Sequence, residues 1–330
     1  MLREQTAANR DRASRALAGL RRYQEAPRAP LQEPMPVIAE TLGATLRDYG
    51  GEGPPVLFVP SLINPPTILD LSPERSLLRW LAGQGRRVLL LDWGWPDEAR
   101  KASDVADHVE RILVPLAESL DQPADLVGYC LGGTLAAAAA PRVSARSLVT
   151  IAAPWRFAGF PDEARARLAR LWSESRPAVA ALGLLPMEVL QSAFWSLDPA
   201  RTISKFEAFA DMAPDSLEAR TFVTLEDWAN DGPPVSGAAA RELFEDFFAA
   251  DLPGSGRWEA SGEPVRPEAL GMPVLNIVSA SDRIVPAATA LPVGERLELA
   301  QGHVGMVVGS RAKAALWEPL AAWLSRTAAR

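Results

Sequence analysis

The amino-acid sequence predicts an α/β fold, in which helices cover both faces of a mostly parallel β-sheet and a helical insertion interrupts the sheet. Two observations support this fold class. Short apolar runs alternate with segments whose apolar residues recur at helical spacing, as in parallel strands joined by crossover helices. From residue 155 to residue 267 the chain then has large apolar residues but no clear strand pattern, before that pattern returns.

The predicted strands are short apolar runs bounded by turn residues or by helical segments. Six segments have this character: 56–60, 87–92, 124–127, 148–152, 273–278 and 296–299. Helices are predicted at 77–81, at 103–120 and in the alanine-rich segment 134–140. This alternation of strand and helix predicts the crossover connections of a parallel sheet.

The sequence divides into three predicted regions. Residues 1–35 form a polar, Arg-rich extension with helical character, residues 36–154 and 268–330 form the α/β core, and residues 155–267 form a helical lid. We expect most aromatic side chains of the lid to pack within the insertion, and a few to line an acyl-binding passage. The Arg-rich extension has two interpretations, a solvated helix face or a surface that binds a partner.

Composition argues against several classes of function. The chain has 330 residues and a net charge of −7, whereas nucleic-acid-binding proteins are basic. It has no run of 18 or more apolar residues and no apolar secretion signal at its start, so we expect neither a membrane span nor secretion. One cysteine excludes an internal disulfide, and two histidines with one cysteine predict no metal centre. No nucleotide fingerprint is present, so we expect no cofactor. The lack of a secretion signal and the single cysteine fit a cytoplasmic location.

The only cysteine, Cys130, lies between the predicted strand at 124–127 and the predicted helix at 134–140. Residues 128–132 read Gly-Tyr-Cys-Leu-Gly, which is the G-x-C-x-G form of the nucleophile elbow of α/β-hydrolases, with sulfur in place of oxygen. An inert buried cysteine is the alternative interpretation. The strand–turn–helix context favours the nucleophile, and it refines the predicted fold to that of an α/β-hydrolase with a helical lid.

A nucleophile in this elbow needs a histidine base and an acid that orients the base. In α/β-hydrolases the chain order is nucleophile, acid, histidine, and Asp282 and His303 follow Cys130 in that order. Each of the two follows a predicted strand, so both are expected at the carboxyl edge of the sheet. Their separation leaves room for one helix and one strand. His303 would take the thiol proton, and Asp282 would hold the imidazole. His108 lies in a helical segment and is predicted to pack or to face solvent.

The oxyanion of a tetrahedral intermediate needs backbone N–H donors. Leu131, which follows the nucleophile, is predicted to supply one of them. The second is expected from the loop after the strand at 56–60, at Leu62 or Ile63.

Several ordered segments resemble those of polyhydroxyalkanoate (PHA) synthases, in particular the short class III and IV catalytic subunits. The elbow resembles the lipase-like box of these synthases. The other matching segments are 64–77, 91–96, 227–233, 281–286 and 302–306. The resemblance covers about residues 35–325.

The resemblance implies an acyltransferase that polymerises (R)-3-hydroxyacyl-CoA, such as 3-hydroxybutyryl-CoA, into polyhydroxyalkanoate, with release of CoA and a thioester on Cys130. Substrate contacts are predicted at Tyr129, Trp228, Asn230 and Val304, which lie within the matching segments. The implied partners are the growing polyester or granule surface, a second copy of the chain and a second synthase subunit.

Sulfur at the elbow favours acyl transfer over simple ester hydrolysis. Transfer from CoA to Cys130 exchanges one thioester for another, so the acyl group stays activated and its later transfer to an alcohol is downhill. Two alternatives stay open. Water can attack the same thioester, which would make the protein a thioesterase, a dienelactone-type hydrolase or a polyester depolymerase. The chain can also be a non-catalytic homologue that binds granules or a partner.

Overall fold

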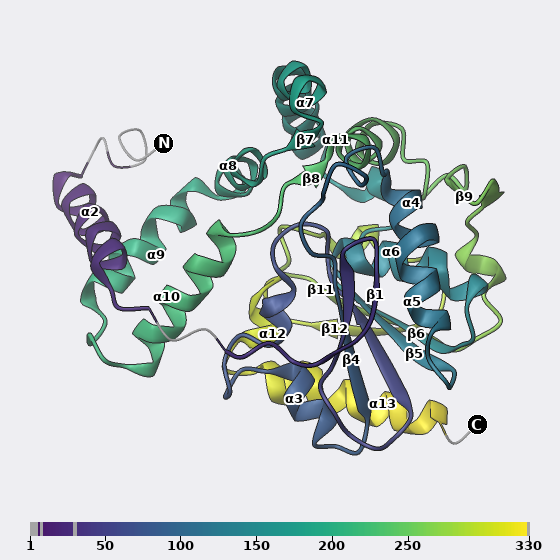
Figure 1. The fold of residues 1–330 in the computed structure, drawn as a ribbon. Helices are drawn as coiled ribbons and strands as arrows, with labels where there is room; N and C mark the ends of the chain where they lie inside the picture. The colour runs from purple at the N-terminus through teal and green to yellow at the C-terminus, as the bar shows by residue number, and fades with distance from the viewer. Residues whose placement is uncertain (1–5, 7–8, 29–31, 329–330) are drawn as a thin grey trace.

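The computed structural model describes residue 6, residues 9–28 and residues 32–328. Eight strands form one sheet in the spatial order β1-β2-β4-β3-β5-β6-β11-β12 (Figure 1). Strands β1, β2 and β4 are joined antiparallel, and all other neighbours are parallel. The mostly parallel sheet is therefore confirmed. The strand bounds are β1 Val37–Thr41, β2 Ala44–Asp48, β3 Pro55–Val59, β4 Arg87–Asp92, β5 Ala124–Tyr129, β6 Ala145–Ile151, β11 Val274–Ser279 and β12 Glu295–Leu299.

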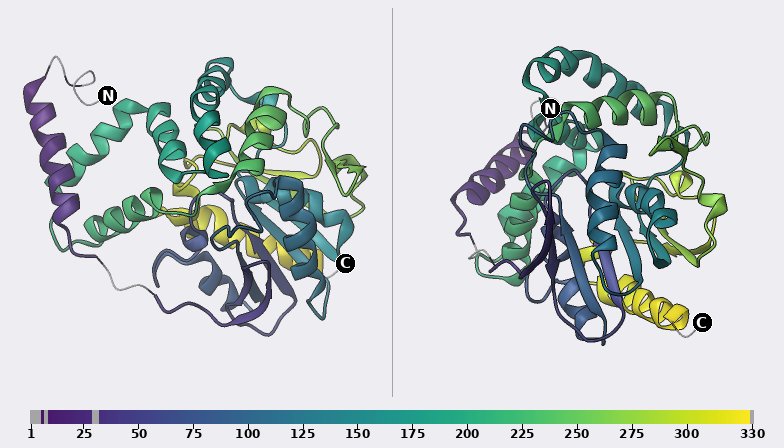
Figure 2. Two further views of the ribbon diagram at one scale, coloured as in Figure 1. Left: turned by 45° about the horizontal axis from the view of Figure 1, so that its top comes forward. Right: turned by 45° about the vertical axis from the view of Figure 1, so that its right-hand side comes forward.

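Helices cover both faces of this sheet (Figures 1 and 2). One face carries α4 (Val105–His108), a π-helical turn (Val109–Leu113), α5 (Val114–Glu118) and α6 (Leu131–Ala139). The other face carries α3 (Leu77–Ala82), α12 (Gly305–Val308), a second π-helical turn (Lys313–Trp317) and α13 (Glu318–Ala328). The predicted helices at 77–81 and 103–120 are thus present.

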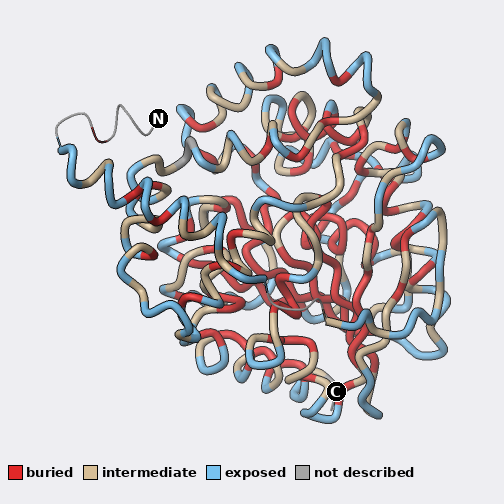
Figure 3. Tube along the Cα trace, turned by 60° about the vertical axis from the view of Figure 1, so that its left-hand side comes forward, coloured by how far each residue is buried: buried red, intermediate tan, exposed pale blue. Residues whose placement is uncertain are grey.

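Alternate side chains of the central strands enter two separate apolar cores. In β3, Leu57 and Val59 join the core beneath α6, whereas Val56 and Phe58 join the core beneath α3 and α13. Figure 3 shows the buried residues gathered in the middle of the molecule, where the sheet lies. Burial on both faces explains why these strands read as continuous apolar runs in the sequence.

One feature of the core was not predicted, and one prediction was wrong. The β1–β2 hairpin forms one edge of the sheet, and no strand was predicted there because β1 is largely exposed. The helix expected between Asp282 and His303 is only a 3₁₀ turn, Ala287–Thr289, so that expectation was wrong. Pro292 and Gly294 follow this turn and leave little room for a longer helix.

A mostly helical lid connects β6 to β11 and extends beyond the carboxyl edge of the sheet (Figure 1). Its longer elements are α7 (Asp162–Leu182), α8 (Met187–Leu197), α9 (Pro199–Asp211), α10 (Leu217–Asn230), α11 (Gly237–Arg241) and a π-helical segment (Glu242–Ala249). Four two-residue strands also occur in this region: β7 Leu184–Leu185, β8 Val235–Ser236, β9 Glu259–Ala260 and β10 Glu263–Pro264. The exact lid boundaries at 155 and 267 stay a prediction. In the part of the chain that the structure describes, no helix is both long and apolar enough to cross a bilayer.

The N-terminal helix α2 (Arg10–Glu25) packs against lid helix α9, on the side of the molecule away from the sheet (Figures 1 and 2). The two helices approach so closely that a Cβ atom at Gly19 would lie 1.9 Å from the carbonyl oxygen of Phe206. The Arg22 guanidinium donates to three carbonyls at the end of α9. Helix α2 of the predicted extension is therefore attached to the lid, whereas Gln32 donates to the Asp70 carbonyl of the core. Residues 1–5, 7–8 and 29–31 of the extension lie outside the described residues.

Candidate active site

Cys130 occupies a sharp turn between β5 and α6, with φ 55° and ψ −133°. Residues other than glycine rarely adopt positive φ, and this strained strand-to-helix turn is the backbone form of a nucleophile elbow. The Cys130 N–H donates to the Ile151 carbonyl (2.9 Å), and the Gly133 N–H donates to the Cys130 carbonyl (2.9 Å). Because Cys130 is at the N-terminus of α6, the helix dipole favours negative charge on its sulfur.

The glycines of the G-x-C-x-G pattern have a steric cause. A Cβ atom at Gly128 would lie 2.3 Å from the Cα of Gly133, in the first turn of α6. A Cβ atom at Gly132 would lie 2.0 Å from the carbonyl oxygen of Val59, at the end of β3. Only glycine therefore allows α6 to begin in contact with β5 and β3.

Asp282 and His303 are both buried, and they are hydrogen-bonded to each other. His303 Nδ1 lies 2.7 Å from Asp282 Oδ2. Asp282 Oδ1 accepts the N–H groups of Ile284 (2.8 Å) and Val285 (2.9 Å), which hold the carboxylate in place. Asp282 follows β11 and His303 follows β12, so the two side chains and Cys130 meet at the carboxyl edge of the sheet.

The surroundings of His303 raise its pKa to about 10. Burial alone would lower this pKa, but the charge of Cys130, hydrogen bonds to Asp282 and to Cys130, and the charge of Asp282 together outweigh burial. The raised pKa favours the protonated imidazole, with Asp282 at Nδ1 and a hydrogen bond to Cys130.

Tyr129 supports His303 from inside the core. The two rings are stacked, with centroids 5.1 Å apart and planes inclined by 29°, and the Tyr129 hydroxyl donates to the His303 carbonyl (3.3 Å). Burial, and then the charges of Cys130 and Asp282, raise the pKa of Tyr129. The sequence predicted that Tyr129 contacts the substrate. The structure buries its ring beside the imidazole, a position that suits orienting His303, and substrate contact by Tyr129 stays a prediction.

The candidate oxyanion donors lie on both sides of the elbow. Leu131 is the first residue of α6, so its N–H has no partner within the helix. The Ile63 N–H already donates to the Ser61 hydroxyl (3.1 Å), which makes Leu62 the better second donor of the two predicted residues. The Ser61 turn was not predicted, although a serine two residues before a loop amide is a sequence signal for it.

The other predicted substrate-binding residues lie at the lid and beside the histidine. Val304 is half-buried and directly follows His303. Trp228 is half-buried at the end of α10, and its indole N–H donates to a carbonyl of the loop after β3 (2.8 Å). Asn230 is exposed and donates to the Tyr23 hydroxyl of α2 (3.4 Å). Substrate contact by these three side chains stays a prediction.

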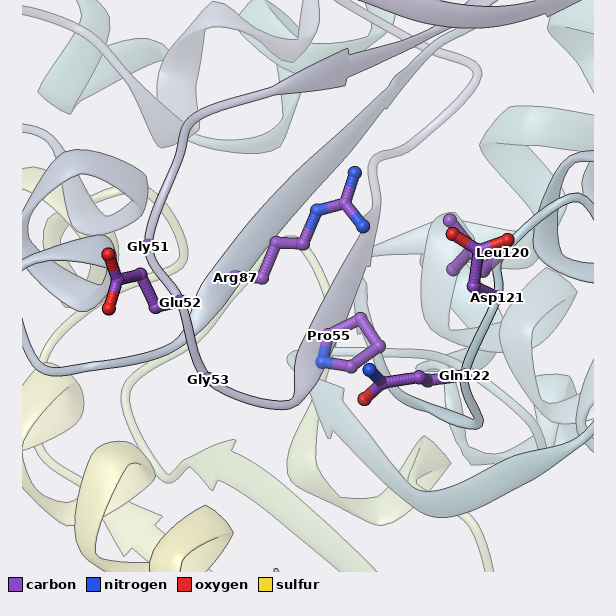
Figure 4. A pocket seen from close by; sticks show the side chains of 8 residues that line it. All are labelled: Gly51, Glu52, Gly53, Pro55, Arg87, Leu120, Asp121 and Gln122. Atoms are coloured by element: carbon purple, nitrogen blue, oxygen red, sulfur yellow. The ribbon is translucent and has the colours of Figure 1, made fainter.

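A cavity of about 190 Å³ lies far from this site (Figure 4). Its lining includes Pro55 and Arg87, the first residues of β3 and β4, and Gln122, which precedes β5. It therefore opens at the amino edge of the sheet, whereas Cys130 follows the carboxyl end of β5. Within the described ranges, no cluster of three or more His, Cys, Asp or Glu side chains is arranged to hold a metal ion.

Comparisons with known proteins agree with the fold and with the family resemblance. A family model described as alpha/beta hydrolase fold matches residues 54–308. The poly(3-hydroxyalkanoate) polymerase subunit PhaC of Haloferax mediterranei is 30% identical over 292 residues, which cover 82% of this chain and 58% of the relative. The chain thus spans less than two thirds of that relative's length. The protein of the same name from Allochromatium vinosum is 29% identical, over 82% of this chain and 80% of the relative. The resemblance to PHA synthases is therefore confirmed.

Solved structures are also similar in fold. The monoacylglycerol lipase of Paleococcus ferrophilus has a TM-score of 0.53 and 17% identity, over 86% of this chain and 99% of the lipase chain. At this identity the likeness concerns the fold alone. Together with the family model, it confirms the predicted α/β-hydrolase fold.

Proposed function

The chain belongs to the alpha/beta hydrolase fold family, and from this premise we propose that it is an acyltransferase that polymerises (R)-3-hydroxyacyl-CoA into polyhydroxyalkanoate. One observation carries the proposal: the only cysteine of the chain occupies the strained elbow, with the hydrogen-bonded pair of His303 and Asp282 at the same sheet edge. The polymerase names of the relatives support the substrate class.

Acylation is the first half of the proposed reaction. The Cys130 thiolate attacks the thioester carbonyl carbon of the CoA substrate, and the negative charge moves to the carbonyl oxygen. The N–H groups of Leu131 and Leu62 would receive this oxyanion. The bond from carbon to the CoA sulfur then breaks, and the CoA sulfur takes the proton of the His303 imidazolium. Free CoA leaves, and the acyl group remains on Cys130 as a thioester.

Ester formation is the second half. His303, now neutral, takes the proton from the hydroxyl group of another 3-hydroxyacyl unit. The hydroxyl oxygen attacks the thioester carbonyl, the new ester bond forms, and the bond from carbon to Cys130 sulfur breaks. The thiolate and the imidazolium are thereby restored. Asp282 stays ionised in this scheme and stabilises the imidazolium.

The choice of sulfur fits this sequence of steps. The first step exchanges one thioester for another, so the free energy of the CoA thioester is retained on Cys130. It is released when the oxygen ester forms. A lid that excludes water and admits a hydroxyacyl group would direct the same intermediate toward polymer rather than toward the free acid.

The proposal is tested by supplying 3-hydroxybutyryl-CoA and measuring both CoA release and the product. We expect CoA release together with polyester, and neither from Cys130→Ala. Free 3-hydroxybutyrate as the only product would assign the protein to the hydrolases. Absence of CoA release, with and without a candidate second subunit, would leave a non-catalytic binding protein.

A further inference from the structure

We infer that Asn64 is a positioning residue that ties the oxyanion loop, residues 60–66, to the C-terminal end of lid helix α10. The consequence is that Leu62 is placed to receive an oxyanion only while α10 is docked on this loop. The inference rests on the proposed function, because it concerns the oxyanion that forms when Cys130 attacks a thioester.

The side chain of Asn64 caps the end of α10. Its Nδ2 donates to the carbonyl oxygens of Trp228 (3.4 Å), Ala229 (3.4 Å) and Asp231 (3.2 Å). The last carbonyls of a helix lack partners within the helix and lie at the negative end of its dipole, so a donor is favoured there. Asn64 itself has φ 65°, a conformation that asparagine adopts more readily than most residues. Both its backbone and its side chain therefore suit this contact.

Two further contacts join the same segments. The indole N–H of Trp228 donates to the carbonyl of Pro65 at 2.8 Å. Gly232, with φ 144°, brings the chain after α10 so close that a Cβ atom there would lie 3.2 Å from the Cα of Asn64. Leu62 and the lid residues 233–236 line one small cavity of about 20 Å³. The lid thus lies against the oxyanion loop on both sides of Asn64.

The oxyanion loop is short, and its position depends on this support. It starts directly after β3 ends at Val59, and it leads into a 3₁₀ turn whose Ile68 and Leu69 are buried. Between these anchors, the Ser61 hydroxyl holds the Ile63 N–H, so residues 61–63 move as one turn. Asn64 follows this turn directly. A displacement of Asn64 therefore moves Leu62 as well.

Catalysis is sensitive to such a displacement. An oxyanion donor acts at about 2.7–3.1 Å from the developing charge, and a misplacement of about 1 Å can cost on the order of 100-fold in rate. Docking of α10 would therefore have two effects at once. It would cover the thioester with the lid, and it would place Leu62 to complete the oxyanion site.

Two variants test the side-chain donor of Asn64 apart from its backbone conformation. Asn64→Gly keeps the positive φ but removes the donor, and Asn64→Asp keeps the shape but presents an acceptor to the three carbonyls. Thr67→Ala changes an exposed residue of the adjoining turn and serves as the matched control. Two rates are compared for each protein: acylation of Cys130 by 3-hydroxybutyryl-CoA, and alkylation of Cys130 by iodoacetamide. Alkylation forms no tetrahedral oxyanion, so it reports the sulfur and His303 without the oxyanion loop.

We expect both Asn64 variants to slow acylation by about 10- to 100-fold, with alkylation unchanged and Thr67→Ala equal to the unaltered protein. Unchanged acylation in both variants would overturn the inference. A parallel loss of acylation and alkylation would also overturn it, because the damage would then lie at Cys130 and His303.

A second readout does not depend on activity. Hydrogen exchange across residues 60–66 and 228–232 should become faster in both Asn64 variants and not in Thr67→Ala. If the unaltered protein is not acylated by this CoA ester, the proposed function fails. Hydrogen exchange then still tests whether Asn64 joins the oxyanion loop to α10. Unchanged exchange rates in both segments would refute this contact.

Discussion

Asp282 Oδ2 lies 2.7 Å from His303 Nδ1. The other oxygen of the same carboxylate accepts two backbone N–H groups, at 2.8 and 2.9 Å. The carboxylate therefore cannot rotate without loss of three hydrogen bonds. With Nδ1 held in this way, Nε2 is the ring nitrogen available to the side chain of Cys130, whose charge and hydrogen bond raise the pKa of His303.

This arrangement predicts a large effect of Asp282→Asn. The asparagine oxygen can still accept the two backbone N–H groups, so its amide NH₂ must face Nδ1. The neutral imidazole then carries its proton on Nε2 and cannot act as a base toward a thiol or a hydroxyl group. We expect CoA release to fall by about 10²- to 10⁴-fold, with little change in the midpoint of thermal unfolding. Activity close to that of the unaltered protein would refute the assignment of Asp282.

The two histidines should titrate on opposite sides of neutrality. The pKa of His303 is raised to about 10, whereas burial lowers the pKa of His108 to about 4. His108 is a packing residue, since it lies against Trp93 with ring centroids 5.8 Å apart. Because the chain has only these two histidines, NMR of ¹⁵N-histidine protein resolves both, and His108→Gln assigns them. We expect neither ring to titrate between about pH 5 and pH 9. Titration of the His303 ring near the ordinary pKa of about 6.5 would contradict the environment described for His303.

The raised pKa of His303 also predicts how stability depends on pH. Its folded pKa of about 10 exceeds its ordinary value of 6.5, so the folded state binds the proton more tightly. The resulting stabilisation is complete below pH 6.5 and is lost as the pH rises toward 10. The free energy of unfolding of His303→Gln, measured in urea, should therefore approach that of the unaltered protein over this interval. A difference that is independent of pH would argue against the ion pair.

The elbow should not tolerate a larger residue at Gly132. A Cβ atom there would meet the carbonyls of Val59 at 2.0 Å and Pro60 at 2.5 Å, and neither can move without shifting the oxyanion loop. We expect Gly132→Ala to lower the free energy of unfolding by at least about 2 kcal/mol and to abolish acylation. Gly271→Ala is the matched control, since a Cβ atom at Gly271 has no neighbour within 4 Å. Equal stability of the two variants would show that the elbow relaxes more easily than its contacts indicate.

The central strands and the order of Cys130, Asp282 and His303 were predictable from sequence for a physical reason. Strands buried on both faces, such as β5 before Cys130 and β11 before Asp282, are continuous apolar runs. His303 follows β12, which is largely exposed, so its place rested on the short run at 296–299 and on the chain order of the three residues. The β1–β2 hairpin lies at the sheet edge, where burial is partial and the pattern is weak.

Contacts that depend on tertiary docking were not predictable. Asn64 meets the end of α10 across 164 residues of chain, and nothing in either segment alone indicates the partner. The position of Tyr129 was missed for a related reason. Tyr129 belongs to the apolar core beneath α3 and α13, and its ring stacks on that of His303. Sequence proximity to the nucleophile therefore did not show that Tyr129 stacks on His303, and its contact with the substrate stays a prediction.

The most direct test of the account is the mass of the intact protein after rapid mixing with 3-hydroxybutyryl-CoA, followed by peptide mapping. We predict a 3-hydroxybutyryl adduct on Cys130 that hydroxylamine removes, as expected for a thioester, and no adduct on Cys130→Ala. An acyl group on another residue, or polymer formation by Cys130→Ala, would contradict the central claim that Cys130 carries the acyl chain.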